Sequence, residues 1–354
     1  MSGKSKTFRF GLAGTGDIAG FYLDHFTRRK DKKDIEFAGG WNRTTAKAQE
    51  FCEKFGGRVY DSLDELLRDE TIDAVVSLTP PTAHFDITLR CLEAGKHVLS
   101  EKPLALSVAD GRRLLETAKK HGVTLSCAPF VLLGRNQREV NNLLDSGRIG
   151  KPVSVTAEMF HGRVEAWHPN PEQFYIKGGG PVLDVGPYPL SLMITWFGPV
   201  AEVQGMFDIA IPERVDLSGR KFTVKKFDQG VALLRFKSGV IGRVAFSYSN
   251  SNTDHHGLEI QGDNGSLALS SITAANGELK ISKKDSGKWD FVEGEPGPYE
   301  ASGVDWSGGI VELADAVREK REPANSARLA LETLEVLLAM EKAAAERTTV
   351  KLTD

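Results

Sequence analysis

Cysteine is scarce in this sequence, and the few present form no recognisable site pattern. Cys52, Cys91 and Cys127 are an odd number in 354 residues and contain no C-x-x-C pair. A disulfide framework and a cysteine zinc site are therefore not indicated. Because each lies in an apolar segment, we expect three small core residues. The neighbouring His255 and His256 lack the spacing and carboxylate partners of a metal site, so no metal is expected.

Long apolar runs and a strong net charge are also missing. No segment approaches the ~20 apolar residues that span a bilayer, and the opening MSGKSKTFRF lacks the core of a signal peptide. The net charge is −3, with both signs interspersed, which is not the basic surface that nucleic-acid binding requires. We therefore expect a cytoplasmic protein with neither a membrane nor a nucleic-acid partner.

The first third of the chain alternates strand patterns with helix patterns. At 354 residues the chain is long enough for two domains. Strands are predicted at Phe8–Ala13, Ile35–Trp41, Ala74–Leu78, His97–Leu99 and Val123–Cys127. Helices are predicted at Ile18–Thr27, Thr44–Phe55, Thr82–Ala94 and from the cap Ser107 to Lys120. Strict alternation implies right-handed crossovers and a parallel sheet covered on both faces. The sequence thus predicts an α/β domain with a doubly wound parallel sheet over residues 1–127.

The remaining residues, 128–354, show longer alternating segments with short turns. Ser238-Gly239 and Asp263-Asn264-Gly265 are typical of hairpins, which indicates a large, mostly antiparallel sheet with one open face. A helix is expected over residues 137–145, and two more at Gly309–Glu319 and Ala327–Ala345. The prediction is an α+β domain for substrate binding and oligomerisation, whose last helices can pack back on the first domain.

A glycine-rich turn follows the first predicted strand. Gly14, Thr15, Gly16, Asp17 and Ile18 begin a G-x-G-x-x-A element that ends at an alanine. The first glycine permits a tight turn, the second lets a pyrophosphate approach the backbone, and the following helix offers N–H donors to it. A plain turn is the alternative reading, but the position between strand and helix favours dinucleotide binding.

The end of the second strand bears on which nicotinamide cofactor is used. A carboxylate at this point would bind the ribose 2′-hydroxyl of NAD. The sequence has Asn42, Arg43 and Thr44 instead, and a guanidinium pairs well with phosphate. NADP is therefore favoured, with NAD still possible; alternatively, Arg43 is a solvated residue at a helix start.

Three further segments resemble the Gfo/Idh/MocA oxidoreductase family. Ala94–Pro103 resembles its A-G-K-H-V-x-x-E-K-P motif, Thr79–His84 its T-P-x-x-x-H element, and Gly178–Tyr188 its G-G-G-x-x-x-D-x-G-x-[HY] segment. The resemblance implies a Rossmann domain, a C-terminal domain whose open sheet forms a dimer or tetramer, and a sugar or polyol substrate. It also places Thr79, Pro80, His84 and Glu101 beside the cofactor, although a structural role for His84 is equally open.

Lys102, Asp184 and Tyr188 are the predicted catalytic residues. A lysine at the end of a parallel strand can stabilise developing negative charge, and Glu101 can orient it or the nicotinamide ribose. Many members of the family have a histidine where this chain has Tyr188, so the sequence resembles the tyrosine-bearing branch. A phenol is a poor base unless a cation such as Lys102 assists it. We therefore expect Lys102 and Tyr188 to move the proton and Asp184 to bind substrate; alternatively, Lys102 acts alone.

Weaker substrate-lining candidates are Trp167, which can stack on a sugar, with His168 and Arg163. The expected activity is hydride transfer between nicotinamide and a sugar or polyol. Two alternatives stay open, namely a nicotinamide-dependent glycosidase and a non-catalytic, cofactor-sensing regulator.

Overall fold

The computed structural model describes residues 6–176, 178–253, 257–297, 299, 301 and 303–353. The chain forms two compact units. The first comprises Met1–Phe130, Gly297–Ala301 and Asp305–Leu331, and the second comprises Val131–Pro296, Ser302–Val304 and Glu332–Asp354.

The first unit contains a parallel sheet, as the alternating pattern predicts, with six strands where five were predicted. Its strands are β1 (Phe8–Ala13), β2 (Ile35–Trp41), β3 (Arg58–Tyr60), β4 (Ala74–Ser77), β5 (His97–Ser100) and β6 (Leu125–Cys127). Their order is β3-β2-β1-β4-β5-β6, and every pairing is parallel. This is the strand order of a dinucleotide-binding doubly wound fold, in which ligands bind beyond the carboxyl ends of the strands.

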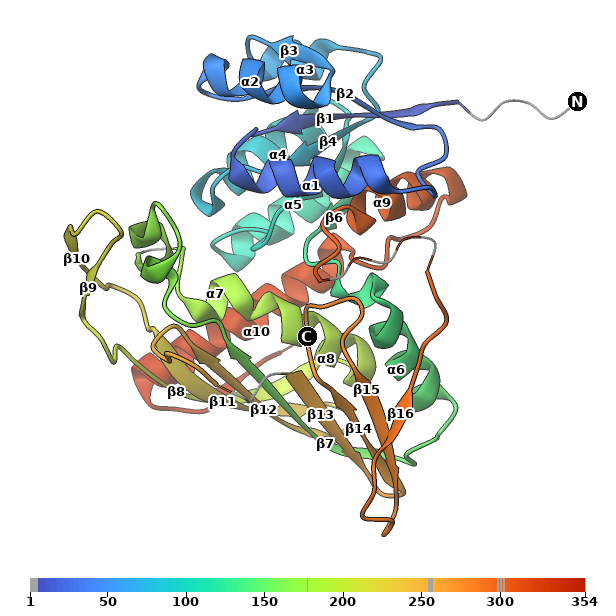
Figure 1. Cartoon of the computed structure of the whole chain (residues 1–354), viewed down its shortest axis with the longest axis vertical. Coiled ribbons are helices and arrows are strands. Elements are labelled where there is room, and N and C mark those ends of the chain that lie inside the picture. Colours follow the sequence, from blue (N-terminus) through green and yellow to red (C-terminus); the bar gives the residue numbers. More distant parts are fainter. Residues whose placement is uncertain are drawn as a thin grey trace, which may run out of the picture. The chain divides into compact units, whose positions relative to one another are not determined.

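Helices cover both faces of this sheet (Figure 1). Helices α1 (Asp17–Arg28) and α2 (Thr45–Phe55) pack through aromatic pairs, with Phe10 edge-on to Phe26 and Phe37 edge-on to Phe51. The opposite face is covered by α3 (Leu63–Arg68), α4 (His84–Glu93) and α5 (Val108–His121), which share one aliphatic core with the strands. Two-sided burial explains why strands such as β4, with all four residues buried, read as continuous apolar runs.

Three local details differ from the prediction. Strand β3 and helix α3 were not predicted. Thr82 does not cap a helix, because Pro81–Ala83 forms a 3₁₀ turn with Pro81 at its start and α4 begins only at His84. Proline favours such a first-turn position.

The three cysteines are confirmed as core residues. All are free, and each is at most 6% exposed. Burial raises the pKa of the Cys91 thiol to about 12, so it stays protonated at neutral pH.

The second unit contains a mixed sheet of nine strands. They are β7 (Pro152–Phe160), β8 (Val200–Asp208), β11 (Gln229–Phe236), β12 (Ile241–Ser247), β13 (Gly257–Gly262), β14 (Gly265–Leu269), β15 (Leu279–Lys283), β16 (Asp290–Val292) and β17 (Val350–Lys351). Their order is β16-β15-β14-β13-β7-β12-β11-β8-β17, and β7–β12 is the one parallel pair among these strands. Both predicted hairpins are confirmed, as β11–β12 and β13–β14. A separate small hairpin joins β9 (Glu213–Val215) to β10 (Lys221–Thr223).

Helices of the second unit lie on one face of its sheet (Figure 1). They are α6 (Arg135–Asp145), α7 (Pro181–Val185), α8 (Pro187–Phe197) and most of α10 (Ala327–Glu346). Helix α10 packs closely enough that a Cβ at Gly186 would lie 2.5 Å from Leu337. The open face exposes apolar side chains of Met206, Leu233 and Ile241. None of the helices in the described residues is both long and apolar enough to cross a membrane.

Helix α9 (Gly308–Glu319) and the first residues of α10 group with the first unit. The segment between them is tied to the end of β6, since the Cys127 N–H donates to the Asn325 carbonyl at 3.0 Å and the Asn325 amide donates back at 3.2 Å.

Candidate active site

The glycine turn lies between β1 and α1, at the carboxyl edge of the parallel sheet. Gly14 has φ +102°, and a Cβ there would lie 2.7 Å from the Leu78 carbonyl oxygen, so no larger residue fits. Gly16 is different, because a Cβ there would meet no heavy atom of the described residues within 4 Å. Gly16 is also the N-cap of α1 and supplies no side-chain cap. The first N–H groups of α1 therefore lack a side-chain acceptor from the cap, as an anion-binding helix start requires.

Three buried hydroxyl groups border this turn without a partner. They belong to Thr15 in the turn and to Ser77 and Thr79 at the end of β4, and none forms a hydrogen bond within the described part of the chain. A buried hydroxyl without a partner is costly, and its presence in a native fold needs an explanation. A dinucleotide supplies phosphate, ribose and amide groups that can satisfy them. The residues present therefore fit the cofactor.

The end of β2 carries the residues expected to distinguish NADP from NAD. The Asn42 side chain accepts a hydrogen bond from the Thr44 N–H at 2.9 Å, which shapes a short turn before α2. Arg43 projects from this turn as an exposed residue.

The E-K-P segment begins directly after β5. The Glu101 carboxylate accepts hydrogen bonds from the Tyr22 hydroxyl at 2.5 Å and from the Lys102 N–H at 2.9 Å. Tyr22 lies on α1 and is fully buried, so it links the helix after the glycine turn to this segment. Lys102 is half-buried, and the peptide bond before Pro103 is cis. Because β1, β4 and β5 are adjacent, the glycine turn, Thr79 and Lys102 share one sheet edge.

His84 is 1% exposed and lies between two backbone carbonyls. Its Nδ1 is 2.7 Å from the Pro103 oxygen and its Nε2 is 2.7 Å from the Thr79 oxygen. Burial lowers the pKa of His84, while the two carbonyl acceptors favour the charged ring. Two roles were predicted for His84, contact with the cofactor and a structural role. Because backbone carbonyls engage both ring nitrogens, this placement favours the structural role.

In the second unit, the D-x-G-x-Y segment spans two short helices. Asp184 lies in α7 and Tyr188 in α8, and Gly186 between them keeps helical backbone angles of −61° and −32°. A Cβ at Gly186 would lie 2.1 Å from the Val182 carbonyl oxygen, so the close helix junction requires glycine. Asp184 is half-buried and Tyr188 is 9% exposed. The structure places these two residues in the second unit and Lys102 in the first.

Both residues lie near Tyr248, which sequence reasoning missed. Tyr248 follows β12 and is fully buried, and its hydroxyl donates a hydrogen bond to the Asp184 carboxylate. Burial raises the pKa of Tyr248 well above its ordinary value, and the nearby Asp184 and Tyr188 raise it further. Its phenol therefore stays protonated and acts as a hydrogen-bond donor.

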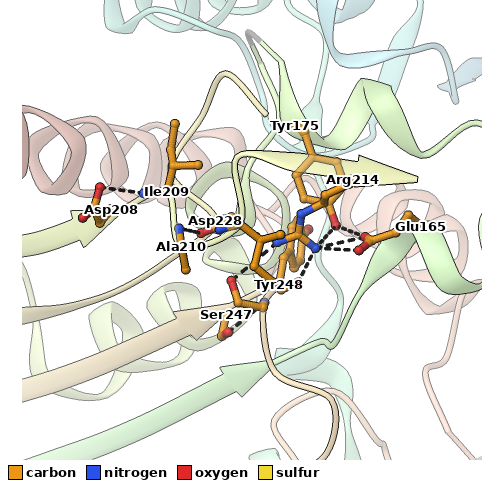
Figure 2. Close-up of polar contacts among 11 residues, drawn as sticks. Glu165, Tyr175, Asp208, Ile209, Ala210, Arg214, Asp228, Ser247 and Tyr248 are labelled. Carbon is orange, nitrogen blue, oxygen red and sulfur yellow. Dashed lines mark hydrogen bonds and ion pairs between the residues drawn. The ribbon is translucent and has the colours of Figure 1, made fainter. Parts of the chain in front are cut away.

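A buried ionic cluster around Arg214 contacts Tyr248 (Figure 2). Arg214 donates to both carboxylate oxygens of Glu165, at 2.8 and 3.0 Å, and to Asp228 at 2.7 Å. It also donates to the Tyr175 hydroxyl at 3.1 Å and to the Tyr248 carbonyl at 2.9 Å. Its side chain is 1% exposed. None of these residues stands in a motif, so the sequence alone gave no signal for them.

The predicted substrate-lining residues lie in the second unit. The exposed Trp167 packs edge-on against His161 and His168, with ring centroids 5.7 and 5.4 Å apart. The ring centroids of His161 and Tyr248 are 6.1 Å apart. Arg163 is exposed. The described residues contain no group of three or more potential metal ligands. His255 and His256 lie outside them.

The strand order and the glycine turn define a dinucleotide-binding Rossmann protein, and comparison with known proteins identifies its family. Residues 8–128 match the oxidoreductase family with an NAD-binding Rossmann fold, and residues 137–268 match the Gfo/Idh/MocA C-terminal domain. The chain belongs to the Gfo/Idh/MocA oxidoreductase family, as its motifs predict. It is an NAD(P)-dependent oxidoreductase.

Several relatives have an assigned reaction. The chain is 30% identical over 270 residues to a dTDP-3,4-didehydro-2,6-dideoxy-alpha-D-glucose 3-reductase of Streptomyces violaceoruber, covering 75% of this chain and 73% of that one. It is 28% identical over 287 residues to a myo-inositol 2-dehydrogenase of Thermotoga maritima, covering 79% and 80%. The fold resembles that of a 3-ketoreductase from Actinomadura kijaniata in complex with NADP, with a TM-score of 0.74, 24% identity and coverage of 96% and 98%.

The Gly16→Val variant tests the cofactor site. Gly16 has φ −80°, which any residue adopts, and its Cβ would meet nothing, so the variant should fold normally. If a pyrophosphate approaches this backbone, the added side chain blocks it, and affinity for NADP should fall at least about tenfold. Gly20→Ala, whose Cβ also meets nothing, is the matched control and should bind normally. Titration of NADP by fluorescence measures both; unchanged binding by Gly16→Val would contradict the site.

Proposed function

We propose that this protein transfers hydride between NADP and a hydroxyl or ketone group of a sugar or polyol. The observation that carries this proposal is the shared sheet edge. It holds a glycine turn bordered by buried hydroxyls that have no partner among the described residues, and a lysine whose backbone N–H donates to the Glu101 carboxylate. The assigned reactions of the sugar reductase and the inositol dehydrogenase support the substrate class.

In this proposal the cofactor is held by the turn residues Gly14–Ile18, by Asn42, Arg43 and Thr44 after β2, and by Thr79, Pro80 and Glu101. The nicotinamide, when bound, supplies or accepts the hydride. Asp184 accepts a hydrogen bond from a substrate hydroxyl. Trp167, His168 and Arg163 line the substrate.

Lys102 and Tyr188 divide the work of proton transfer. An ordinary phenol has a pKa near ~10 and removes a proton poorly at neutral pH. A neighbouring ammonium favours the phenolate and so brings the phenol closer to the operating pH. In oxidation, Tyr188 takes the proton of the substrate hydroxyl while Lys102 stabilises the negative charge; in reduction, the same proton returns.

A screen of the purified protein against sugars and polyols, with NADP and NAD in parallel, tests the activity. Absorbance of the reduced nicotinamide should change with at least one substrate. Retained cofactor with hydrolysis of a glycoside and no net redox change would instead identify glycosidase chemistry. Tight cofactor binding without any turnover would identify a regulator.

We also propose that the protein is a dimer or tetramer joined through the open face of its nine-stranded sheet. This face exposes Met206 on β8, Leu233 on β11 and Ile241 on β12, and it also carries the ion pairs Arg243–Glu158 and Arg235–Glu202. Exposed apolar side chains next to charged ones are typical of a surface that binds another protein. Light scattering should report a multiple of the 38.7 kDa chain mass; a monomer would contradict the proposal, and Met206→Lys should shift an oligomer toward monomer.

Tyr188→Phe tests the proton-transfer role. If Tyr188 is the acid and base, loss of its hydroxyl should lower turnover at least ~100-fold with the substrate found by the screen. Tyr60→Phe is the control, because it removes a buried hydroxyl that bonds Asp69 in the first unit. A near-normal turnover of Tyr188→Phe would mean that Lys102 alone transfers the proton.

Arg43→Ala tests the cofactor preference. If Arg43 contacts the 2′-phosphate, the variant loses a charge-assisted hydrogen bond worth roughly 1.5–3 kcal/mol. The KM for NADP should then rise by about ten- to a hundredfold, whereas the KM for NAD should stay within about twofold. Arg68→Ala, an exposed arginine on α3, should change neither value. An equal rise in the KM for NADP and the KM for NAD would show that Arg43 does not bind the 2′-phosphate.

A further inference from the structure

We infer that Tyr248 is a positioning residue for Asp184, and that the buried Arg214 cluster holds Tyr248 in place. The inference rests on the proposed function, in which Asp184 binds the substrate. It adds a residue that no motif marks, located 64 positions along the chain from its partner.

The contact between the two residues is direct and enclosed. The Tyr248 hydroxyl donates to the Oδ2 of Asp184, and the Tyr248 side chain is fully buried. Its ring packs edge-on against Tyr175, with centroids 5.7 Å apart, and tilted against His161 at 6.1 Å. These contacts, together with full burial, restrict the ring and keep its hydroxyl directed at the carboxylate.

The backbone of Tyr248 is fixed at both of its polar groups. Its N–H donates to the Asp228 carbonyl at 2.7 Å, and its carbonyl accepts from Arg214 at 2.9 Å. The Asp228 carboxylate in turn accepts from Arg214 at 2.7 Å and from the Ala210 N–H at 2.7 Å (Figure 2). The same guanidinium thus fixes the Tyr248 carbonyl directly and the Tyr248 N–H through Asp228.

The ring that packs on Tyr248 belongs to the same cluster. The Tyr175 hydroxyl donates to Glu165 at 2.6 Å, and the Arg214 guanidinium lies 4.6 Å from the Tyr175 ring centroid. Arg214 therefore holds both the backbone of Tyr248 and the neighbour of its ring.

The consequence for Asp184 is orientation. A carboxylate with one oxygen committed to a fixed phenol loses much of its rotational freedom, and the partners that orient a binding group contribute strongly to its affinity. The phenol also stabilises the ionised form of the carboxylate, which is the form that accepts a substrate hydroxyl. Tyr248 acts through Asp184 and need not touch the substrate.

The test is a cycle of Tyr248→Phe, Asp184→Asn and the double variant in the full-length enzyme, using the substrate found by the screen. Tyr248→Phe keeps the ring and removes the hydroxyl. The KM for substrate should rise about tenfold, while kcat should change less than about threefold, because binding is weakened in ground and transition states alike. The double variant should have the KM of Asp184→Asn alone, since the hydroxyl acts only through the carboxylate.

The matched control is Tyr60→Phe in the first unit. It also removes a buried tyrosine hydroxyl that donates to an aspartate, Asp69, and it should leave the KM for substrate unchanged. If Asp184→Asn raises KM and Tyr248→Phe does not, the positioning inference is wrong. Normal kinetics for Asp184→Asn would instead refute the proposed role of Asp184. Should Tyr248→Phe fail to fold, 3-fluorotyrosine at position 248 retains the donor and should keep KM within about twofold; a tenfold rise would overturn the inference.

Discussion

A buried guanidinium must have its charge balanced, and in the second unit that requirement organises the region around Asp184. Arg214 is 1% exposed and lies between the carboxylates of Glu165 and Asp228, themselves 10% and 0% exposed. Removing one partner of such a group leaves an uncompensated buried charge, which typically costs about 3–5 kcal/mol. The cluster therefore joins segments far apart in the sequence, namely the β9–β10 hairpin, the two short turns that carry Glu165 and Tyr175, and the end of β12.

In the first unit the corresponding constraint is close approach of the backbone. Gly14 can be only glycine, because its φ is positive and the backbone of Leu78, just after β4, lies against it. Gly16 is glycine although the described residues leave open space around it. Packing explains the first residue and leaves the second unexplained. The hydroxyls of Thr15 and Thr79, which have no partner in the described part of the chain, are likewise unexplained by packing. A bound dinucleotide accounts for all three observations at once, which is why the fit is stronger than the glycine pattern alone.

Features encoded within a short segment could be predicted from the sequence. The parallel strands other than β3, the two hairpins and the family motifs are local patterns of apolar residues, turn residues and spacing. The Ser107 cap, which accepts from the Asp110 N–H at 3.1 Å, is another such feature. Tyr22 and Tyr248 could not be found this way, because each meets its carboxylate across 79 or 64 residues. Within its own segment, each tyrosine has the pattern of an ordinary buried aromatic residue. Only the folded chain brings Tyr22 to Glu101 and Tyr248 to Asp184.

Stability alone does not account for the Arg214 cluster. Buried ion clusters can often be replaced by apolar residues of similar volume with no loss of stability, because desolvation offsets most of their attraction. Apolar packing, however, fixes volume more than direction. Hydrogen bonds from one guanidinium to Glu165, Asp228 and the Tyr248 carbonyl fix direction as well. A site whose carboxylate must meet a substrate hydroxyl needs that angular precision. On the proposal that Asp184 binds the substrate, the cluster belongs with that binding chemistry, although none of its members is a motif residue.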